Sequence, residues 1–575
     1  MKKVLSLSLI TAALFIAGCA QESTEKKSLA ENSSAIKILH TVELAEPDPK
    51  ESIVRERVSQ DQESMKVMRT GHSSVMAAQQ FQNRSRNLTM SPPQYLLAAD
   101  NEKYNHQKNN GVLIVSEQPV STFSVDVDTA SYANIRRVLN QGSLPQHDAV
   151  RVEELINYFS YDYPTPTTAP FSVYSEIGPS PYNADKHLLH IGIKGKSVAA
   201  DSRPAANLVF LIDVSGSMNQ ANKIGLLKNA LKMLTNQLSQ QDSVAIVVYA
   251  GAAGTVLTPT QGDNKQAIID ALAKLTAGGS TNGGEGIEAA YRLAQQSFIK
   301  DGINRIILAT DGDFNVGTTD NQALKSLIES KRKSGIDLSI LGLGTGNYND
   351  ELMQQLAQNG NGNAYYIDTL NEARKVLVEE LSSTLLTIAK DVKIQVEFNP
   401  QLVSEYRLIG YETRALNRED FNNDKVDAGD IGAGHTVTAI YEVSLTNSSN
   451  KANDPLRYQN NSSQSDENNS DELAFLRLRY KAPEESSELI EIAINKKQII
   501  NKLDDTSNNY QFSAAVAGFA QLLRGGTNLS TMELDNIILL AKKGKGEDTH
   551  GYRAEFINMV KLAQALSPQL VANNE

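Results

Sequence analysis

The sequence predicts an α/β fold with a doubly wound, mainly parallel sheet, flanking α+β regions and a helical C-terminus. Three observations predict it. Between residues 204 and 388, apolar runs that fit buried strands alternate with segments of helical periodicity. After residue 389 the apolar residues recur with a period of two, which is typical of strands with one buried face. Helical spacing returns near the end of the chain, at residues 510–523, 530–541 and 552–565.

The α/β part is expected to alternate strand and helix along its whole length. Its first strand is residues 209–212, and the helix that follows carries a row of leucines on one face. The other expected strands are residues 244–249, 306–310, 338–343 and 364–367, and the other expected helices are residues 267–275, 287–298 and, as the closing helix, 370–386. Parallel strands joined by helices give a sheet covered on both faces.

The flanking regions mix strands and helices. Before the α/β part we expect strands at residues 123–128, 171–177 and 187–193 and helices at residues 131–141 and 149–159. After it we expect strands at residues 392–398, 406–411, 435–445, 473–480 and 489–494. We predict that the strands within residues 171–193 pair with those after residue 389, which forms a β-sandwich into which the α/β part is inserted.

The first nineteen residues have the organisation of a secretory signal. Lys2 and Lys3 precede an apolar run, residues 4–17, that is too short for a comfortable membrane span. The run ends in Ile-Ala-Gly-Cys19, which resembles the lipobox of bacterial lipoproteins. This resemblance implies acylation of Cys19 and cleavage before it. Because Ala20 follows and not aspartate, we expect an outer-membrane lipoprotein that faces the periplasm or the cell surface. An ordinary signal peptide with a chance cysteine is the alternative.

Composition divides the rest of the chain and limits its partners. Residues 20–115 are rich in Gln, Ser, Asn, Glu and Lys, and predict a disordered tether. The folded regions are then residues 116–203, 204–388 and 389–575. The chain has 55 Lys and Arg against 67 Asp and Glu, and its net charge of −12 argues against nucleic acid as a partner. Cys19 is the single cysteine, which rules out a disulfide within the chain.

The strongest chemical signal is the segment from Asn207 to Met218. Its apolar run ends in Asp213-x-Ser215-x-Ser217, so the loop after the strand presents one carboxylate and two hydroxyls. These are hard oxygen ligands of the kind that suit Mg²⁺ or Mn²⁺. Capping of a helix that starts nearby would explain this loop, but it would explain this loop alone.

Two further loops carry oxygen ligands. The glycine-rich residues 278–284 include Thr281, with Ser280 beside it as a competing hydroxyl, and a second apolar strand ends in Asp311. Ligands of doubly wound sheets bind beyond the carboxyl ends of the strands. Asp213 and Asp311 both lie at such ends, and Thr281 lies in a loop that can reach them.

In this order, the three loops resemble the metal-ion-dependent adhesion site of a von Willebrand factor type A (VWA) domain. The resemblance implies a Mg²⁺ site, with Mn²⁺ or Ca²⁺ as alternatives, whose ligands are Asp213, Ser215, Ser217, Thr281 and Asp311. In that family the hydroxyls approach the ion directly or through water, and the aspartates supply charge. A coordination position stays open, and an Asp or Glu of a protein partner fills it.

The resemblance extends to both flanks of the α/β part. Residues 121–132 and 405–416 resemble the corresponding regions of bacterial VWA lipoproteins of the YfbK kind. We therefore expect a lipid-anchored envelope protein that is not an enzyme and that binds a protein partner, for adhesion or scaffolding, through Mg²⁺. The alternatives are a metal-dependent hydrolase that uses the same ion, and a structural envelope lipoprotein with a non-functional metal site.

Two other acidic motifs are weaker. Asp126-Val-Asp128-Thr is similar to the nucleophile motif of haloacid-dehalogenase phosphatases, but Ala130 stands where that motif needs Thr or Val. The acidic residues 420–430 could bind Ca²⁺, but their spacing does not fit an EF-hand, and a solvated loop is the expected structure.

Overall fold

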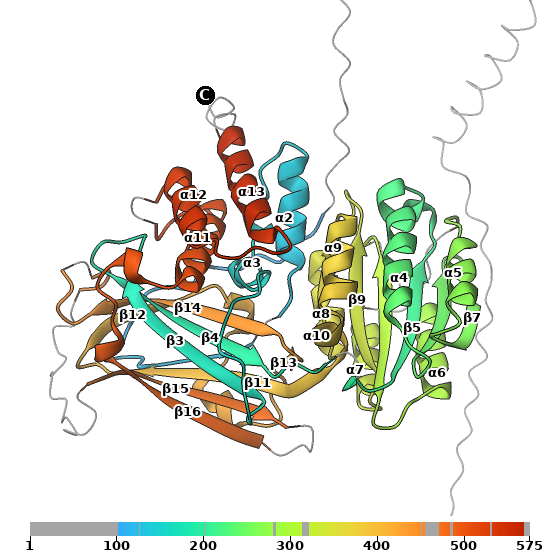
Figure 1. Ribbon diagram of the computed structural model, residues 1–575, viewed down its shortest axis with the longest axis horizontal. Helices are drawn as coiled ribbons and strands as arrows, with labels where there is room; N and C mark the ends of the chain where they lie inside the picture. The colour runs from blue at the N-terminus through green and yellow to red at the C-terminus, as the bar shows by residue number, and fades with distance from the viewer. Residues whose placement is uncertain are drawn as a thin grey trace, which may run out of the picture. The chain divides into compact units, whose positions relative to one another are not determined.

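The computed structural model (Figure 1) describes residues 102–125, 127–199, 202–279, 283–312, 321–449, 451–454, 471–482, 487–529 and 532–567. All of them belong to one compact unit, Gln94–Glu575. Cys19 and Thr281, on which two predictions rest, lie outside the described residues. In the described ranges, no helix is both long and apolar enough to cross a membrane.

The α/β domain contains a six-stranded sheet in the order β10-β9-β8-β5-β6-β7. Every neighbouring pair is parallel except β6 with β7, which confirms the mainly parallel sheet predicted from the sequence. The strands are β5 (Ala206–Asp213), β6 (Ser243–Tyr249), β7 (Ala253–Gln261), β8 (Ile303–Thr310), β9 (Asp337–Leu343) and β10 (Ala364–Ile367). β5 lies near the centre of the sheet, between β6 and β8.

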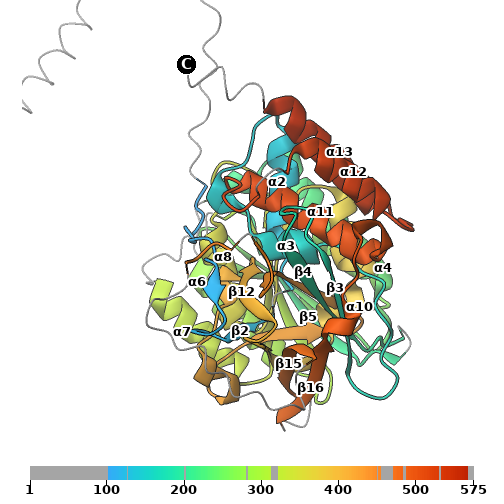
Figure 2. The ribbon, with the colours of Figure 1, turned by 90° about the vertical axis from the view of Figure 1, so that its left-hand side faces the viewer.

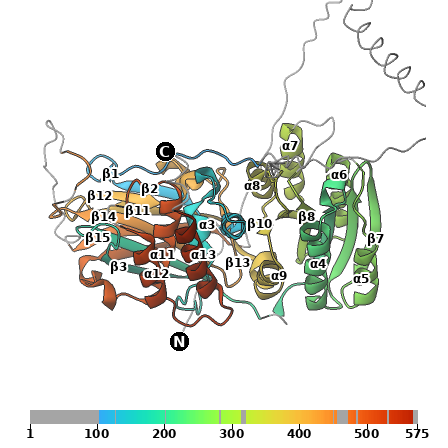
Figure 3. The same ribbon diagram turned by 90° about the horizontal axis from the view of Figure 1, so that it is seen from above.

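Helices cover both faces of this sheet, as Figure 3 shows from above. On one face lie α4 (Leu226–Gln237), α5 (Lys265–Ala273) and α9 (Leu370–Arg374), and on the other lie α6 (Gly283–Gln296), α7 (Asn321–Arg332) and α8 (Asp350–Asn359). The side chains of β5 alternate accordingly, since Phe210 packs in the first layer and Leu211 in the second. The strand is therefore buried on both sides.

Four elements of this domain differ from the prediction, and two of them, α7 and α8, are helices to which the sequence analysis assigns no range. The sequence does not predict β7, because it is an edge strand whose side chains are mostly exposed and show no apolar alternation. The expected closing helix, residues 370–386, is broken. It consists of α9, the π-helical turn η5 (Lys375–Glu379) and α10 (Leu381–Leu385), and Glu380 between the last two has φ −100° and ψ 18°. The N–H of Glu380 donates to the Lys375 carbonyl, five residues back, at 2.9 Å, whereas a regular α-helical bond would reach the residue four back.

The flanking regions build a β-sandwich. One sheet has the order β1-β12-β14-β4-β3, and the other has the order β13-β11-β15-β16, with β2 also paired to β11. The strands are β1 (Leu113–Ile114), β2 (Val120–Ser124), β3 (Phe171–Pro179), β4 (His187–Gly195), β11 (Thr387–Phe398), β12 (Val403–Ile409), β13 (Gly429–Gly432), β14 (Thr436–Leu445), β15 (Glu472–Lys481) and β16 (Ser487–Asn495). β4 precedes the α/β domain and pairs with β14, which follows it, so the predicted pairing across the insertion is confirmed.

A layer of helices covers the outer face of the first sheet (Figure 2). This helical layer consists of α2 (Ala130–Asn140), α3 (Val152–Asn157), α11 (Asn508–Leu523), α12 (Leu534–Lys543) and α13 (Tyr552–Leu566). Residues of β4 alternate between the two sides: Leu189 faces the sandwich core, and His190 faces the helices. Burial lowers the pKa of His190 to about 3, and its ring bonds to the hydroxyls of Tyr163 and Ser513. It is a neutral core histidine.

Residues 102–115, which the sequence assigned to the disordered tether, are ordered. The backbone of Lys103 bonds to Tyr348 and Asp350 of the α/β domain at 3.0 and 3.1 Å, and β1 pairs with β12. These pairings join residues far apart in the chain, so the polar composition of this segment gave no sign of them. The expected strand at residues 123–128 begins and ends earlier, as β2, and the expected helix at residues 149–159 is shorter, as α3.

Candidate metal site

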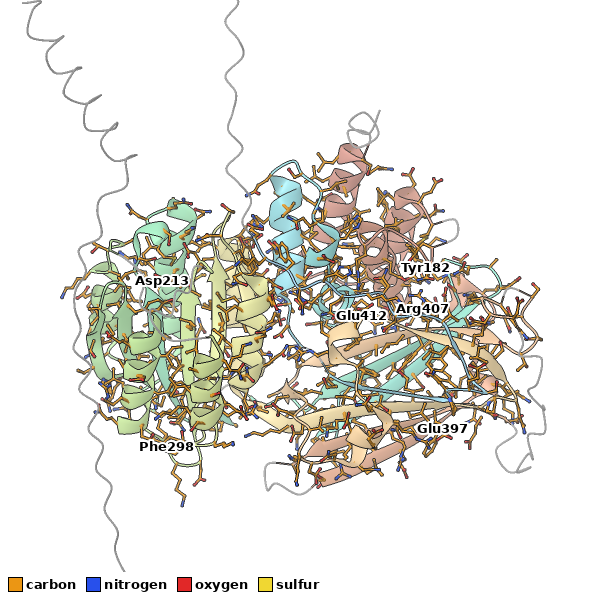
Figure 4. All side chains as sticks on the ribbon, turned by 180° about the vertical axis from the view of Figure 1, so that it is seen from behind. Tyr182, Asp213, Phe298, Glu397, Arg407 and Glu412 are labelled. Carbon is orange, nitrogen blue, oxygen red and sulfur yellow. The ribbon has the colours of Figure 1, made fainter. Side chains whose placement is uncertain are left out.

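Asp213 lies at the carboxyl end of β5, as the sequence predicts. Figure 4 shows it at one end of the α/β domain, with Phe298 at the opposite end. Its side chain is fully buried. One carboxylate oxygen accepts from the backbone N–H of Ser215 at 2.8 Å, and the other accepts from the hydroxyls of Tyr249 and Thr310, each at 3.2 Å. The loop after β5 and the two neighbouring strands, β6 and β8, therefore orient this carboxylate.

The first two predicted loops are joined by backbone hydrogen bonds. The N–H of Gly216 donates to the carbonyl of Gly279 at 3.0 Å, and the N–H of Gly278 donates to the carbonyl of Val214 at 2.7 Å. The hydroxyl oxygens of Ser215 and Ser217 lie 3.0 Å apart on the first loop. Thr281 comes two residues after Gly279 and lies outside the described residues, so its predicted role stays a prediction.

Helix capping does not account for the first loop. The helical segment after it begins with the π-helical turn η4 (Ala221–Gly225), whose N-cap residue is Gln220. The side-chain oxygen of Asp213 instead holds the N–H of Ser215, two residues on. Asp213 therefore stabilises its own loop and does not cap the next helix.

Asp311 brings a second buried carboxylate to the same edge. It directly follows β8, which pairs in parallel with β5. Burial raises the pKa of Asp213, the hydrogen bonds from Ser215 lower it, and the negative charge of Asp311 raises it again. The two carboxylates are thus close enough to influence each other.

Lys223 is a residue of this site that the sequence reasoning missed. Its ammonium nitrogen lies 2.8 Å from a carboxylate oxygen of Asp311, and both side chains are buried. No sequence motif marks this lysine, because it stands six residues after Ser217 in a polar stretch like many surface lysines.

The residues at this edge fit a divalent cation by their chemistry. The described donors are carboxylate and hydroxyl oxygens, the ligand types that Mg²⁺ prefers. Asp213 and Asp311 carry two buried negative charges and Lys223 supplies one positive charge. Since uncompensated buried charge is costly, a further cation at this edge would be stabilised. Asp213, Ser215, Ser217 and Asp311 would hold it.

The two weaker acidic motifs have structural roles. The carboxylate of Asp128 accepts from Arg414 and from the backbone N–H of Ala364, and Asp126 lies outside the described residues. Asp424 pairs with Arg479 and Asp427 pairs with Arg332. In the part of the chain that the structure describes, no group of three or more His, Cys, Asp or Glu side chains is arranged to hold a metal ion.

Comparison with known families agrees with the fold of the chain. The family model "von Willebrand factor type A domain" matches residues 207–380, the model "Uncharacterized protein YfbK, C-terminal" matches residues 383–566, and the model "von Willebrand factor" matches residues 98–190. "Uncharacterized protein YfbK" of Escherichia coli K12 is 46% identical over 474 residues, which cover 81% of each chain. The chain belongs to the YfbK family of VWA proteins. Its α/β domain is the VWA domain, and the sandwich with its helices corresponds to the flanking family regions.

Other relatives share shorter stretches with this VWA protein. Protein sll0103 of Synechocystis is 28% identical over 216 residues, which cover 37% of this chain and 50% of that protein. Inter-alpha-trypsin inhibitor heavy chain H3 of Mesocricetus auratus is 25% identical over 263 residues, or 42% and 29% of the two chains. The solved structure of a von Willebrand factor type A protein from Catenulispora acidiphila covers 69% of this chain and 91% of its own, at 16% identity and a TM-score of 0.39.

The family indicates a general class of function. A VWA domain points to interaction with other proteins, including adhesion.

Proposed function

We propose that this protein binds a protein partner through a Mg²⁺ ion held by Asp213, Ser215, Ser217 and Asp311, with Thr281 as a further ligand. The observation that carries the proposal is the joining of separate loops at one edge of the sheet. Hydrogen bonds connect the Ser215 loop to the glycine-rich loop, and Thr310 connects Asp213 to β8, the strand that Asp311 follows. An open coordination position on the ion would take an Asp or Glu side chain of the partner. The protein would act in adhesion or as a scaffold.

The metal dependence of partner binding tests this proposal. The full chain is immobilised and exposed to envelope proteins of the source cells, once with Mg²⁺ and once with EDTA. We expect at least one protein to be retained with Mg²⁺, released by EDTA, and absent from a Ser217→Ala variant, because that variant lacks one hydroxyl ligand. Mass spectrometry identifies the retained proteins. An identical set of retained proteins with EDTA, or with the variant, would contradict a metal-mediated contact.

We further propose that a lipid on Cys19 anchors the protein to the outer membrane, where it faces the periplasm or the cell surface. Two or three acyl chains give stable anchoring, since each buried CH₂ contributes about 0.8 kcal/mol. We expect Cys19→Ser to move the protein from the membrane fraction to the soluble fraction after cell lysis. Immunoblotting of the two fractions measures this. A variant that stays with the membranes would mean that the anchor lies elsewhere, and Ser6→Ala serves as the control for a change within the signal segment.

A further inference from the structure

Lys223 is a buried lysine that contacts the candidate metal site. It stands in the π-helical turn η4 before α4, and only 2% of its surface is exposed. Its ammonium donates to the Asp311 carboxylate at 2.8 Å. Single π-helical turns are rare and often occur at functional sites. The positive charge of Lys223 is therefore in direct contact with Asp311, one of the residues expected to hold the metal.

The path of this lysine is fixed by the loop after β9. Gly344 has φ +78°, and a Cβ atom built on it would lie 2.1 Å from Cε of Lys223. A residue with a side chain at position 344 would therefore collide with the lysine stem and would also be strained at this φ. The backbone at the carboxyl edge of the sheet thus leaves room for the Lys223 stem, and the ammonium at its end bonds to Asp311.

The charges at the site show what this lysine would change. Asp213, Asp311 and Lys223 together carry a net charge of −1. A divalent cation would bring the net charge to +1, and one carboxylate from a partner would return it to zero. With a neutral residue at position 223, the metal alone would neutralise the site, and a partner carboxylate would leave it negative. Buried net charge is unfavourable. With Lys223 the site therefore favours the metal together with a carboxylate, and with a neutral residue at position 223 it favours the metal alone.

We infer that Lys223 couples the two ligands of the site. Its positive charge weakens binding of a divalent metal alone and favours binding of the metal together with a carboxylate. The inference rests on the proposed function and adds to it the reason why the bound partner is acidic. Lys223 is a specificity-determining residue here, since it would act through Asp311 and the field at the metal.

The test is a calorimetric titration of the full chain with Mn²⁺, in chloride and in acetate at matched ionic strength. Acetate is the probe for the partner's carboxylate. The variants are Lys223→Met, which keeps the stem, and Lys223→Gln, which also keeps a hydrogen-bond donor for Asp311. Lys228→Met is the control, because Lys228 belongs to the same helical segment but donates to the Ala273 carbonyl. Thermal melting shows which variants are folded.

We expect Lys223→Met and Lys223→Gln to bind Mn²⁺ at least about 10-fold more tightly in chloride, because a repulsive charge is gone. Acetate should strengthen Mn²⁺ binding to the parent and to Lys228→Met, and less so to the Lys223 variants. Equal Mn²⁺ affinity of folded parent and variants, or an unchanged acetate effect, would overturn the coupling and leave the proposed metal site standing. Absence of Mn²⁺ binding from all of these proteins, with and without acetate, would overturn the metal site itself.

Discussion

Replacing Asp213 with alanine is expected to lower the affinity for Mn²⁺ by about 100-fold or more, since even an outer group of a metal site contributes about 10–100-fold. The substitution removes one of two carboxylates at the site. It also removes the acceptor that holds the N–H of Ser215 and the hydroxyls of Tyr249 and Thr310. The site therefore loses the negative charge of Asp213, and the first loop loses the hydrogen bond that orients it.

Metal-induced stabilisation measures this effect in the full chain. Mn²⁺ at a hundredfold excess over the parent's Kd should stabilise the parent by about 2.7 kcal/mol and raise its melting temperature, whereas the same Mn²⁺ concentration should stabilise Asp213→Ala by about 0.4 kcal/mol or less. Without metal the two proteins should melt within a few degrees of each other, because the substitution also removes a carboxylate whose pKa burial raises. Asp270→Ala, an exposed carboxylate on α5, is the control. A variant that Mn²⁺ stabilises as much as the parent would place the ion elsewhere.

Replacing Arg136 with methionine is expected to destabilise the protein by about 3–5 kcal/mol, the usual cost of breaking a buried ion pair. All five donors of this buried guanidinium are used. They contact Asp368 twice, at 2.5 and 2.8 Å, Glu372 and Glu555 at 2.7 Å each, and the hydroxyl of Tyr158 at 3.0 Å. Arg136 lies on α2, so these bonds tie the closing segment of the VWA domain to the helical layer.

Urea unfolding of the parent and the variant tests the Arg136 prediction. Burial raises the pKa of Glu372 and the positive charge of Arg136 lowers it, so this carboxylate depends on the arginine to stay charged. Adding Glu372→Gln to Arg136→Met should therefore recover part of the lost stability. Arg477→Met is the control, since it breaks a half-exposed pair with Glu491 and should cost less than about 1 kcal/mol. A loss that small for Arg136→Met would mean that the closing segment is held by other contacts.

The sequence predicted the fold class because its strongest patterns are local. β5, β8 and β9 each contain a short apolar run, and α4 and α6 show clear 3.6-residue periodicity. β7 and the ordered residues 102–115 have no such pattern, because one is an exposed edge and the other is polar. The closing helix is likewise interrupted at Glu380, whose N–H bonds five residues back to Lys375, and periodicity does not reveal this change.

For the candidate site, the sequence predicted candidate oxygen ligands by their position after strands. Asp213, Ser215, Ser217 and Asp311 lie at the predicted edge, and Thr281 stays a prediction outside the described residues. Lys223 could not be found in this way. A lysine in a polar stretch is solvated in most proteins, whereas this one is buried in the turn η4, where Gly344 leaves room for its stem.

The amino-acid sequence by itself determined which residues end the central strands and therefore which oxygens meet at the carboxyl edge. It could do so because strand direction and residue spacing are local properties of the chain. The tertiary structure alone decided the charge at that edge and the attachment of the VWA domain to its flanks. The charge depends on the contact of Lys223 with Asp311, 88 residues away, and the attachment depends on the contacts of Arg136 with carboxylates more than 200 residues away. Such contacts arise only when the whole chain packs.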